Sequence, residues 1–230
     1  MSNLVAYEFE QPICTITLDD GKVNSLSPQM LGEINAALDQ AEKDGAIVIL
    51  AGRPDRFSAG FDLKVVAGGG TTAVNMLIDG FRLGERLLSF PTPVVVACTG
   101  HALAMGSFLL LSVDYRIGAD GAYKIGANEV AIAMTMPRFA VEICRQRLAP
   151  AHFHRAVNTA EIYTPAGAVE AGFLDEVVPA DALMTAACGK ATALAALSLP
   201  AHKATKLRSR EKALQAVGEA IAADEAELRT

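Results

Sequence analysis

The stretch FSAGFDL at residues 57–63 and the stretch GHALAMGS at residues 100–107 decide the fold. Each belongs to an apolar strand that runs into a turn of small residues and then into a predicted helix. A turn of this kind at a helix start leaves backbone N–H groups without acceptors. Two such turns can direct two N–H groups at one carbonyl oxygen. This arrangement is an oxyanion hole, which stabilises an enolate or a tetrahedral intermediate.

The composition is that of a compact domain with a large core. The chain has 230 residues, of which 51% are hydrophobic and 20% are charged. This length suits one domain, to which a helical appendage can be attached. The formal net charge of −6 argues against nucleic acid or an anionic membrane as the main partner.

The cysteines and the first residues indicate a cellular compartment. The chain has four cysteines: Cys14, Cys98, Cys144 and Cys188. They are far apart and form no CxxC pair, so we expect no zinc or other metal site, and reduced, mostly buried thiols in a cytoplasmic protein. Residues 1–5 contain no basic segment followed by an apolar core, so no signal peptide is expected. The longest apolar run, near 108–113, is too short to span a bilayer.

The spacing of apolar residues predicts an α/β fold. Strands are expected at 4–9, 13–18, 47–51, 94–98, 114–119, 123–125 and 174–178. Helices are expected at 28–43, 72–90, 107–112, after Pro137, after Pro150, at 165–172, and from 181 onward with a break at Pro200. Because strands alternate with helices, we expect right-handed crossovers and a largely parallel sheet.

Further segments carry a family resemblance over nearly the whole chain. They are ITL at 16–18 with KVNSLS at 22–27, PTPVVVA at 91–97, SVDYRI at 112–117 and TPAGAVEAGFLDEVV at 164–178. Together with the two turns, they resemble the crotonase (enoyl-CoA hydratase/isomerase) family. The resemblance implies a crotonase-like ββα superhelix with a helical C-terminal region. It places an acyl-CoA-binding core at 1–180 and a helical trimerisation region at 181–230, in a homotrimer or a hexamer made of two trimers.

The same resemblance implies roles for residues at the two turns. The backbone N–H groups of Phe61 and Met105 are expected to form the oxyanion hole. The residues expected along coenzyme A are Ser58, Ala59, Phe61, Asp62 and Leu63. No separate cofactor is implied, because the substrate is itself a coenzyme A thioester. The helix that begins near Gly106 is expected to direct its positive end at the thioester oxygen.

One departure from the family pattern decides the expected chemistry. Hydratases of the family resemble one another in carrying two glutamates, and the matching positions here hold Phe108 and Glu129. Two carboxylates orient and activate a water molecule, which Phe108 cannot do. A single carboxylate can take a proton from C2 of an acyl chain and return it at C4. The pattern therefore resembles Δ3,Δ2-enoyl-CoA isomerases, with Glu129 as the base and a pKa raised by its apolar neighbours.

Three other functions are compatible with this pattern. A hydratase would need another acid or base in place of the missing carboxylate. A thioesterase would use the same hole, with Glu129 activating water against the carbonyl carbon. A non-catalytic acyl-CoA-binding homologue would bind the thioester without turnover.

The remaining candidates concern the pocket and a basic run. Pocket residues are expected to be His101, Gly106, Phe108 and Met134. His101 can instead be a packing histidine with a backbone partner. The basic run comprises Lys203, Lys206, Arg208 and Arg210. It is either a solvated helix face or a contact for coenzyme A phosphates.

Overall fold

The computed structural model describes residues 3–230. The strands are β1 (Val5–Glu10), β2 (Ile13–Leu18), β3 (Ser25–Leu26), β4 (Ile47–Gly52), β5 (Asp55–Ser58), β6 (Gly60–Phe61), β7 (Val94–Cys98), β8 (Gly100–Leu103), β9 (Tyr115–Ala119), β10 (Ile125–Gly126) and β11 (Glu176–Val178). The α-helices are α1 (Pro28–Asp44), α2 (Leu63–Gly68), α3 (Gly70–Ser89), α4 (Met105–Leu111), α5 (Arg138–Arg147), α6 (Pro150–Thr159), α7 (Pro165–Ala171), α8 (Leu183–Ala195), α9 (Leu199–Ser209) and α10 (Glu211–Leu228). Two short 3₁₀ turns are η1 (Val130–Ile132) and η2 (Ala180–Ala182).

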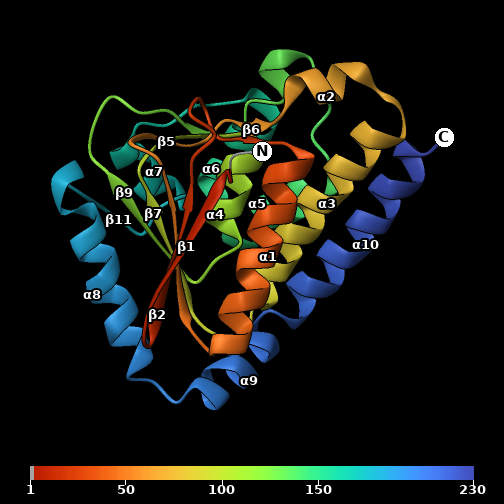
Figure 1. Cartoon of the computed structure of the whole chain (residues 1–230). Helices are drawn as coiled ribbons and strands as arrows, with labels where there is room; N and C mark the ends of the chain where they lie inside the picture. The colour runs from red at the N-terminus through yellow and green to blue at the C-terminus, as the bar shows by residue number, and fades with distance from the viewer. Residues whose placement is uncertain (1–2) are drawn as a thin grey trace.

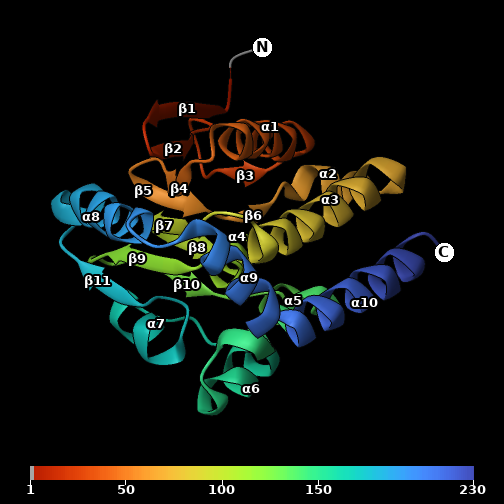
Figure 2. The ribbon, with the colours of Figure 1, turned by 90° about the horizontal axis from the view of Figure 1, so that it is seen from below.

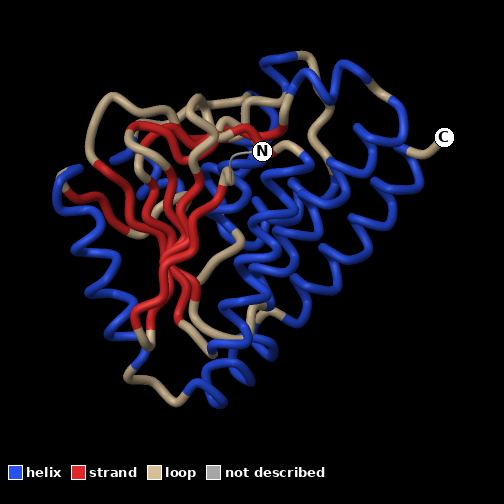
Figure 3. Tube along the Cα trace, viewed as in Figure 1, coloured by secondary structure: helices blue, strands red, loops and turns tan. Residues whose placement is uncertain are grey.

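A six-stranded sheet in the order β1-β2-β4-β7-β9-β11 runs through the molecule. β1 is antiparallel to β2, and the other pairings in this sheet are parallel. Strands β4 and β7 are buried along their whole length. Helices cover both faces of these strands, which explains why they read as continuous apolar runs. Figures 1 and 3 show α8 on one side of the sheet and α1, α3 and α10 on the other.

Two smaller sheets extend the large one: β10-β8-β5 and β3-β6. Their pairings are also parallel. β4, β7 and β9 of the large sheet are each followed directly by a strand of a small sheet, and the chain then enters a helix. The repeated β, β, α order stacks along the molecule, as the view from below shows (Figure 2). The predicted α/β class with a largely parallel sheet is therefore confirmed.

The C-terminal helices pack on the rest of the chain. Leu183, Ala187 and Ala191 of α8 are buried against β4, β7 and β9. α10 packs against α3 and α5, and Figure 1 shows it beside α3. The role of residues 181–230 in trimerisation stays a prediction.

Several boundaries differ from the sequence prediction, among them those of β10 and of the C-terminal helices. The strand expected at 123–125 is only the two-residue β10, which pairs with β8. The C-terminal helical region breaks at 196–198 and not at Pro200, which occupies the first turn of α9. Proline is tolerated there because first-turn N–H groups have no intrahelical acceptor in any case.

Most of the cysteines are buried, as predicted. Cys14, Cys98 and Cys144 are buried, Cys188 is exposed, and all four are free thiols. Within residues 3–230, no single helix has the length and apolar character to cross a bilayer; only α8 and α9 together, with the preceding 3₁₀ turn, pass that test, as a pair bent by 99°.

Candidate active site

The two small-residue turns touch each other because glycine stands at the contacts. β5 pairs with β8, with Ser58 opposite Ala102. Gly60 has φ of +89°, and a Cβ there would lie 2.8 Å from the Cβ of Ala104 and 3.2 Å from the N of Met105. A Cβ on Gly106 would lie only 2.4 Å from the carbonyl oxygen of Ser58. Only glycine permits this approach, and at Gly60 this backbone conformation also favours it.

The positions predicted to form the oxyanion hole lie at this contact. Met105 is the first residue of α4, so its N–H has no acceptor within the helix. Its side chain is buried in the core, which suits a role for the backbone alone. Phe61 ends β6, and its ring packs edge-on against Phe81 with centroids 5.9 Å apart. A Cβ at Gly80 would lie 2.4 Å from the Phe61 ring, so a third glycine makes room for that ring.

A cavity of about 480 Å³ opens beside the two turns. Its wall is mostly apolar and comes from both turns, from α2, α3 and α4, from the segment before α5, and from the end of α10. The lining residues are Ala59, Phe61, Leu63, Val66, Leu77, Phe81, Ala104, Phe108, Asn128, Glu129, Ile132, Met134, Thr135, Met136, Pro137, Arg138, Asp224, Glu227 and Leu228. A largely apolar cavity with a few polar groups is typical of a small-molecule site.

Glu129 is the group in this cavity whose pKa is raised most by burial. It lies shortly after β10, and its side chain is 5% exposed. Its Oε2 has no hydrogen-bond partner among residues 3–230. Burial raises the pKa of the Glu129 carboxyl from 4.5 to about 7. A carboxyl of this kind can both accept and return a proton near neutral pH.

Phe108 occupies the position that a second catalytic carboxylate would hold. It lies on α4, is 2% exposed and lines the cavity with its apolar ring. The other carboxylates in the wall are Asp224 and Glu227, and both form ion pairs with Arg138. Among the described residues of the wall, Glu129 is therefore the carboxylate without an ion-pair partner.

The structure brings together some of the predicted site residues and separates others. Phe61, Phe108, Glu129, Met134, Ala59 and Leu63 line the cavity. Asp62 instead caps α2, accepting a hydrogen bond from the N–H of Lys64 at 2.9 Å. Ser58 is buried behind the turn, where its hydroxyl donates to the carbonyl oxygen of Asn24.

Two predicted pocket residues lie outside the cavity wall. His101 accepts a hydrogen bond from the N–H of Lys124 at its Nδ1, and its ring packs edge-on against Tyr123. It is the packing histidine of the alternative interpretation, because it lies outside the cavity wall and has a backbone partner. Gly106 packs against Ser58 and serves the contact between the turns, not the pocket.

Sequence reasoning missed the contribution of α10 and of Asn128. Asp224, Glu227 and Leu228 line the cavity, at helical spacing that puts them on one face of α10. The spacing was visible in the sequence, but which core surface this face meets depends on tertiary packing. Asn128 precedes Glu129, and its Oδ1 is likewise buried without a partner among the described residues.

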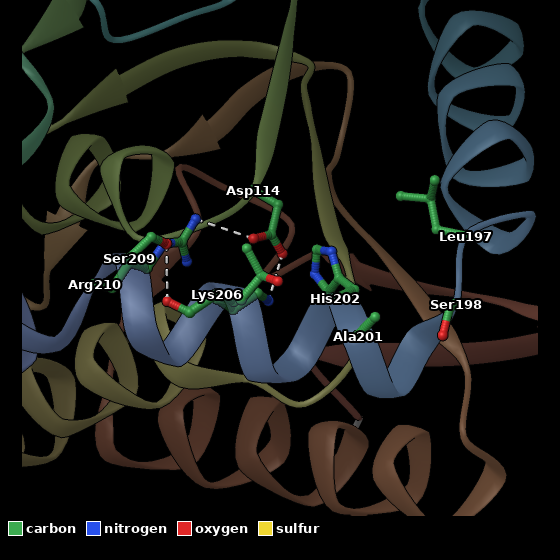
Figure 4. A pocket seen from close by; sticks show the side chains of 9 residues that line it. Asp114, Leu197, Ser198, Ala201, His202, Lys206, Ser209 and Arg210 are labelled. Carbon is green, nitrogen blue, oxygen red and sulfur yellow. Dashed lines mark hydrogen bonds and ion pairs between the residues drawn. The ribbon is translucent and has the colours of Figure 1, made fainter.

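The prediction for the basic run is wrong for Lys206 and Arg210, whereas Lys203 and Arg208 are exposed, as a solvated helix face requires. A second cavity, of about 420 Å³, lies along α9 (Figure 4). Lys206 is 5% exposed, and its Nζ donates to the carbonyl oxygens of Phe90 and Thr92 and to Asp114 at 2.6 Å. Arg210 also donates to Asp114, at 3.0 Å. These two cations hold α9 against the end of the sheet, so they form neither a solvated face nor a phosphate site.

Removing the Lys206 ammonium is expected to destabilise the fold. Lys206→Met would leave two buried carbonyl oxygens without this donor and remove one of the two cations that pair with Asp114, and we expect a loss of about 3 kcal/mol in the free energy of unfolding. Urea denaturation measures this change. The matched control is Lys203→Met on the same helix, which replaces an exposed lysine and is expected to change stability by less than about 0.5 kcal/mol. Equal effects of the two changes would contradict the assignment.

Burial of Glu129 also makes a prediction about stability and pH. Because its pKa is raised from 4.5 to about 7 in the folded protein, the unfolded chain loses this proton first. Stability from this group is therefore complete below pH 4.5 and decreases as the pH rises through about 7, by about 3 kcal/mol. Glutamine does not ionise, so Glu129→Gln lacks this loss. We therefore expect the free energy of unfolding of the variant, relative to that of the wild type, to increase between pH 4 and pH 8. Urea denaturation at several pH values measures this difference. Plots of unfolding free energy against pH that stayed parallel for the two proteins would contradict the prediction.

Comparison with known proteins identifies the family. The model of the enoyl-CoA hydratase/isomerase family matches residues 8–229. The chain belongs to the enoyl-CoA hydratase/isomerase family. A solved structure of an enoyl-CoA hydratase/isomerase family protein from Pseudomonas syringae is 47% identical, with a TM-score of 0.96 and 98% of each chain covered. The crotonase-like ββα fold is thus confirmed.

Two further relatives are named for two different reactions. An enoyl-CoA hydratase structure from Mycobacterium marinum is 45% identical, with a TM-score of 0.94 over 98% of this chain and 99% of that chain. The rat mitochondrial enoyl-CoA delta isomerase 1 is 31% identical over 77% of this chain, and the match spans 63% of the rat protein. Within the enoyl-CoA hydratase/isomerase family, these relatives therefore carry the names of both reactions.

In the described part of this enoyl-CoA hydratase/isomerase family member, no group of three or more His, Cys, Asp or Glu side chains is placed to hold a metal ion.

Proposed function

We propose that this protein is an acyl-CoA enzyme that converts 3-enoyl-CoA into 2-enoyl-CoA. One observation supports the isomerase over the other reactions of the family. Glu129 is the cavity carboxylate without an ion-pair partner, and the position that would supply a second one holds Phe108. A single buried carboxyl with a pKa of about 7 suits a proton transfer in which one group is first base and then acid.

The reaction can be written with one proton and no added reactant. The ionised Glu129 takes a proton from C2, and the electron pair of that C–H bond moves toward the thioester carbonyl. The N–H groups of Phe61 and Met105 stabilise the resulting enolate oxygen. As the enolate collapses, a double bond forms between C2 and C3, and the former C3–C4 double bond accepts the proton of Glu129 at C4. The carboxylate is regenerated, and the mass of the acyl-CoA is unchanged.

The apolar wall supports this cycle by limiting access of water. Phe61, Phe81 and Phe108 line the cavity together with aliphatic side chains. Water in such a site would compete for the enolate and would stabilise the charge of Glu129. A drier cavity keeps the proton on Glu129 until C4 accepts it.

The coenzyme A moiety is proposed to follow the first turn. Ala59, Phe61 and Leu63 line the cavity there, and Leu63 is 61% exposed, so the site continues to the surface. The thioester is the substrate, and the proposed reaction requires no metal or other cofactor. We further propose a homotrimer or a hexamer, with residues 181–230 as the trimerisation region, in the cytoplasm.

A panel of trans-3-enoyl-CoA thioesters of increasing chain length tests the proposal. Mass and the absorbance of the conjugated thioester are followed with the wild type and with Glu129→Gln. We expect conversion to the 2-enoyl isomer at unchanged mass, lost in the variant. Release of free coenzyme A would instead establish a thioesterase, and binding without turnover of either the 3-enoyl or the 2-enoyl thioesters would establish a non-catalytic homologue.

Hydration is the second candidate function. A relative that is 45% identical over nearly the whole chain is named an enoyl-CoA hydratase. In addition, the buried Oδ1 of Asn128 is a hydrogen-bond acceptor in the residue next to Glu129. A gain of one water by a trans-2-enoyl-CoA, without conversion of the 3-enoyl-CoA, would establish this function.

A further inference from the structure

The start of α5 is capped by a residue from α10. The residue before α5 is Pro137, whose side chain makes no capping hydrogen bond. The first N–H groups of a helix need acceptors from elsewhere. Asp224 supplies them: its Oδ1 accepts from the N–H of Arg138 at 3.0 Å, and its Oδ2 accepts from the N–H of Phe139 at 2.9 Å. The Arg138 guanidinium adds an ion pair at 3.2 Å.

This cap lies at one end of the segment that carries Glu129. Residues 127–137 connect β10 to α5, and their regular structure is the short turn η1. Val130 and Ile132 are 45% and 44% exposed, so the side chains of this turn pack only partly against the core. Within the segment, the carbonyl oxygen of Glu129 accepts from the N–H groups of Ile132 and Met134. The far end of the segment is fixed where Asp224 binds the start of α5.

Asp224 also joins this segment to the last wall of the cavity. It is 5% exposed, and it lines the cavity together with Glu227 and Leu228 of α10. Glu227 reaches the same Arg138 guanidinium, at 2.6 Å. The cap therefore connects α10, α5 and the Glu129 segment at one point.

Asp224 is not a second catalytic carboxylate. Both of its oxygens accept hydrogen bonds from backbone N–H groups, and one of them also pairs with Arg138. These contacts commit both oxygens of the carboxylate to the start of α5. Its contribution to a reaction must pass through the residues that it holds.

We propose that Asp224 is a positioning residue for Glu129, holding residues 127–137 and the end of α10 together as one wall of the acyl cavity. The proposal rests on the proposed function only for the choice of substrate, because it applies to any reaction that Glu129 performs. A shift of about 1 Å in a catalytic group can lower a rate about 10²-fold. Asp224 would thus affect the rate without touching the substrate's reacting atoms.

The test compares Asp224→Ala and Asp224→Asn with a matched control. In the control, Glu33→Ala, a carboxylate is lost that accepts from the N–H groups of Leu4 and Val5, at 2.6 and 3.0 Å. This is the same kind of contact, on α1 and outside the cavity wall. Measurements are kcat, KM, the pH profile of kcat/KM, and amide hydrogen exchange over residues 127–139.

We expect Asp224→Ala to lower kcat between about tenfold and 10²-fold. Water should then reach Glu129 more easily, so the midpoint of the pH profile should fall below its wild-type position. Amide exchange over 127–139 should accelerate. Asp224→Asn keeps one acceptor oxygen and should retain part of the activity. This variant still tests the proposal if Asp224→Ala fails to fold. Glu33→Ala should keep kcat within about twofold, because its contacts lie far from the base.

Two results would overturn the proposal. One is unchanged kcat and an unchanged pH midpoint in both Asp224 variants. The other is an equal loss of kcat in Glu33→Ala, which would show a general effect of stability. Failure of the proposed function is distinguishable: if the wild type hydrates its substrate and does not isomerise it, the same comparison on hydration still tests Asp224.

Discussion

Replacing Glu129 with glutamine is expected to lower kcat for the isomerisation of 3-enoyl-CoA about 10²- to 10⁴-fold. Glutamine has nearly the same shape but cannot take a proton from C2. KM should change little, because the side chain contributes one polar group to a mostly apolar wall. Steady-state kinetics on a 3-enoyl-CoA measures both constants.

The control for this change is Glu170→Gln, which alters an exposed glutamate on α7 and should leave kcat within about twofold. In the wild type, kcat/KM should rise with pH through about 7, since the carboxyl must be ionised to accept the proton. A variant that retained a tenth or more of wild-type kcat would exclude Glu129 as the base.

The second large effect is expected from Gly60→Ala, with a fall in kcat of about 10²- to 10³-fold. The new Cβ would lie 2.8 Å from the Cβ of Ala104, and the backbone at φ +89° is strained for alanine. The two turns must then separate, which moves the N–H groups of Phe61 and Met105 off the enolate oxygen. Kinetics on the folded fraction, checked by near-ultraviolet circular dichroism, measures the loss.

Gly32→Ala is the matched control, because nothing lies within 4 Å of the added Cβ on α1. It should leave kcat unchanged and stabilise the helix by about 0.5–1 kcal/mol. Gly106→Ala is an independent second variant, since its Cβ would lie 2.4 Å from the Ser58 carbonyl oxygen. Wild-type kcat in both Gly60→Ala and Gly106→Ala would contradict the role of the turn contact.

Local patterns were sufficient for much of the fold. The strand predictions at 13–18 and 94–98 agree with β2 and β7 because each is an unbroken run of apolar or β-branched residues bounded by turn residues. The helix prediction at 28–43 differs from α1 by one residue, since Ser27 and Pro28 supply both a cap and a first-turn proline. β10 is shorter than predicted because only Ile125 and Gly126 pair with β8.

For the site, sequence was informative about backbone turns and less so about side-chain partners. Gly60 and Gly106 predicted a turn each, and the structure shows that these glycines also let the turns touch. The burial of Lys206 could not be predicted, because its acceptors at Phe90, Thr92 and Asp114 come from distant parts of the chain. The wall supplied by α10 could not be predicted for the same reason.

The most direct test of a single carboxylate that moves a proton is the reaction of a trans-3-enoyl-CoA in water enriched in oxygen-18. The account predicts conversion to the conjugated 2-enoyl-CoA with no oxygen-18 in any acyl product. With the matching trans-2-enoyl-CoA as substrate, a labelled 3-hydroxyacyl-CoA, formed while the 3-enoyl-CoA is left unconverted, would show that Glu129 activates water in spite of Phe108. A labelled free carboxylate would show hydrolysis of the thioester, and either product in place of the isomer would contradict the account.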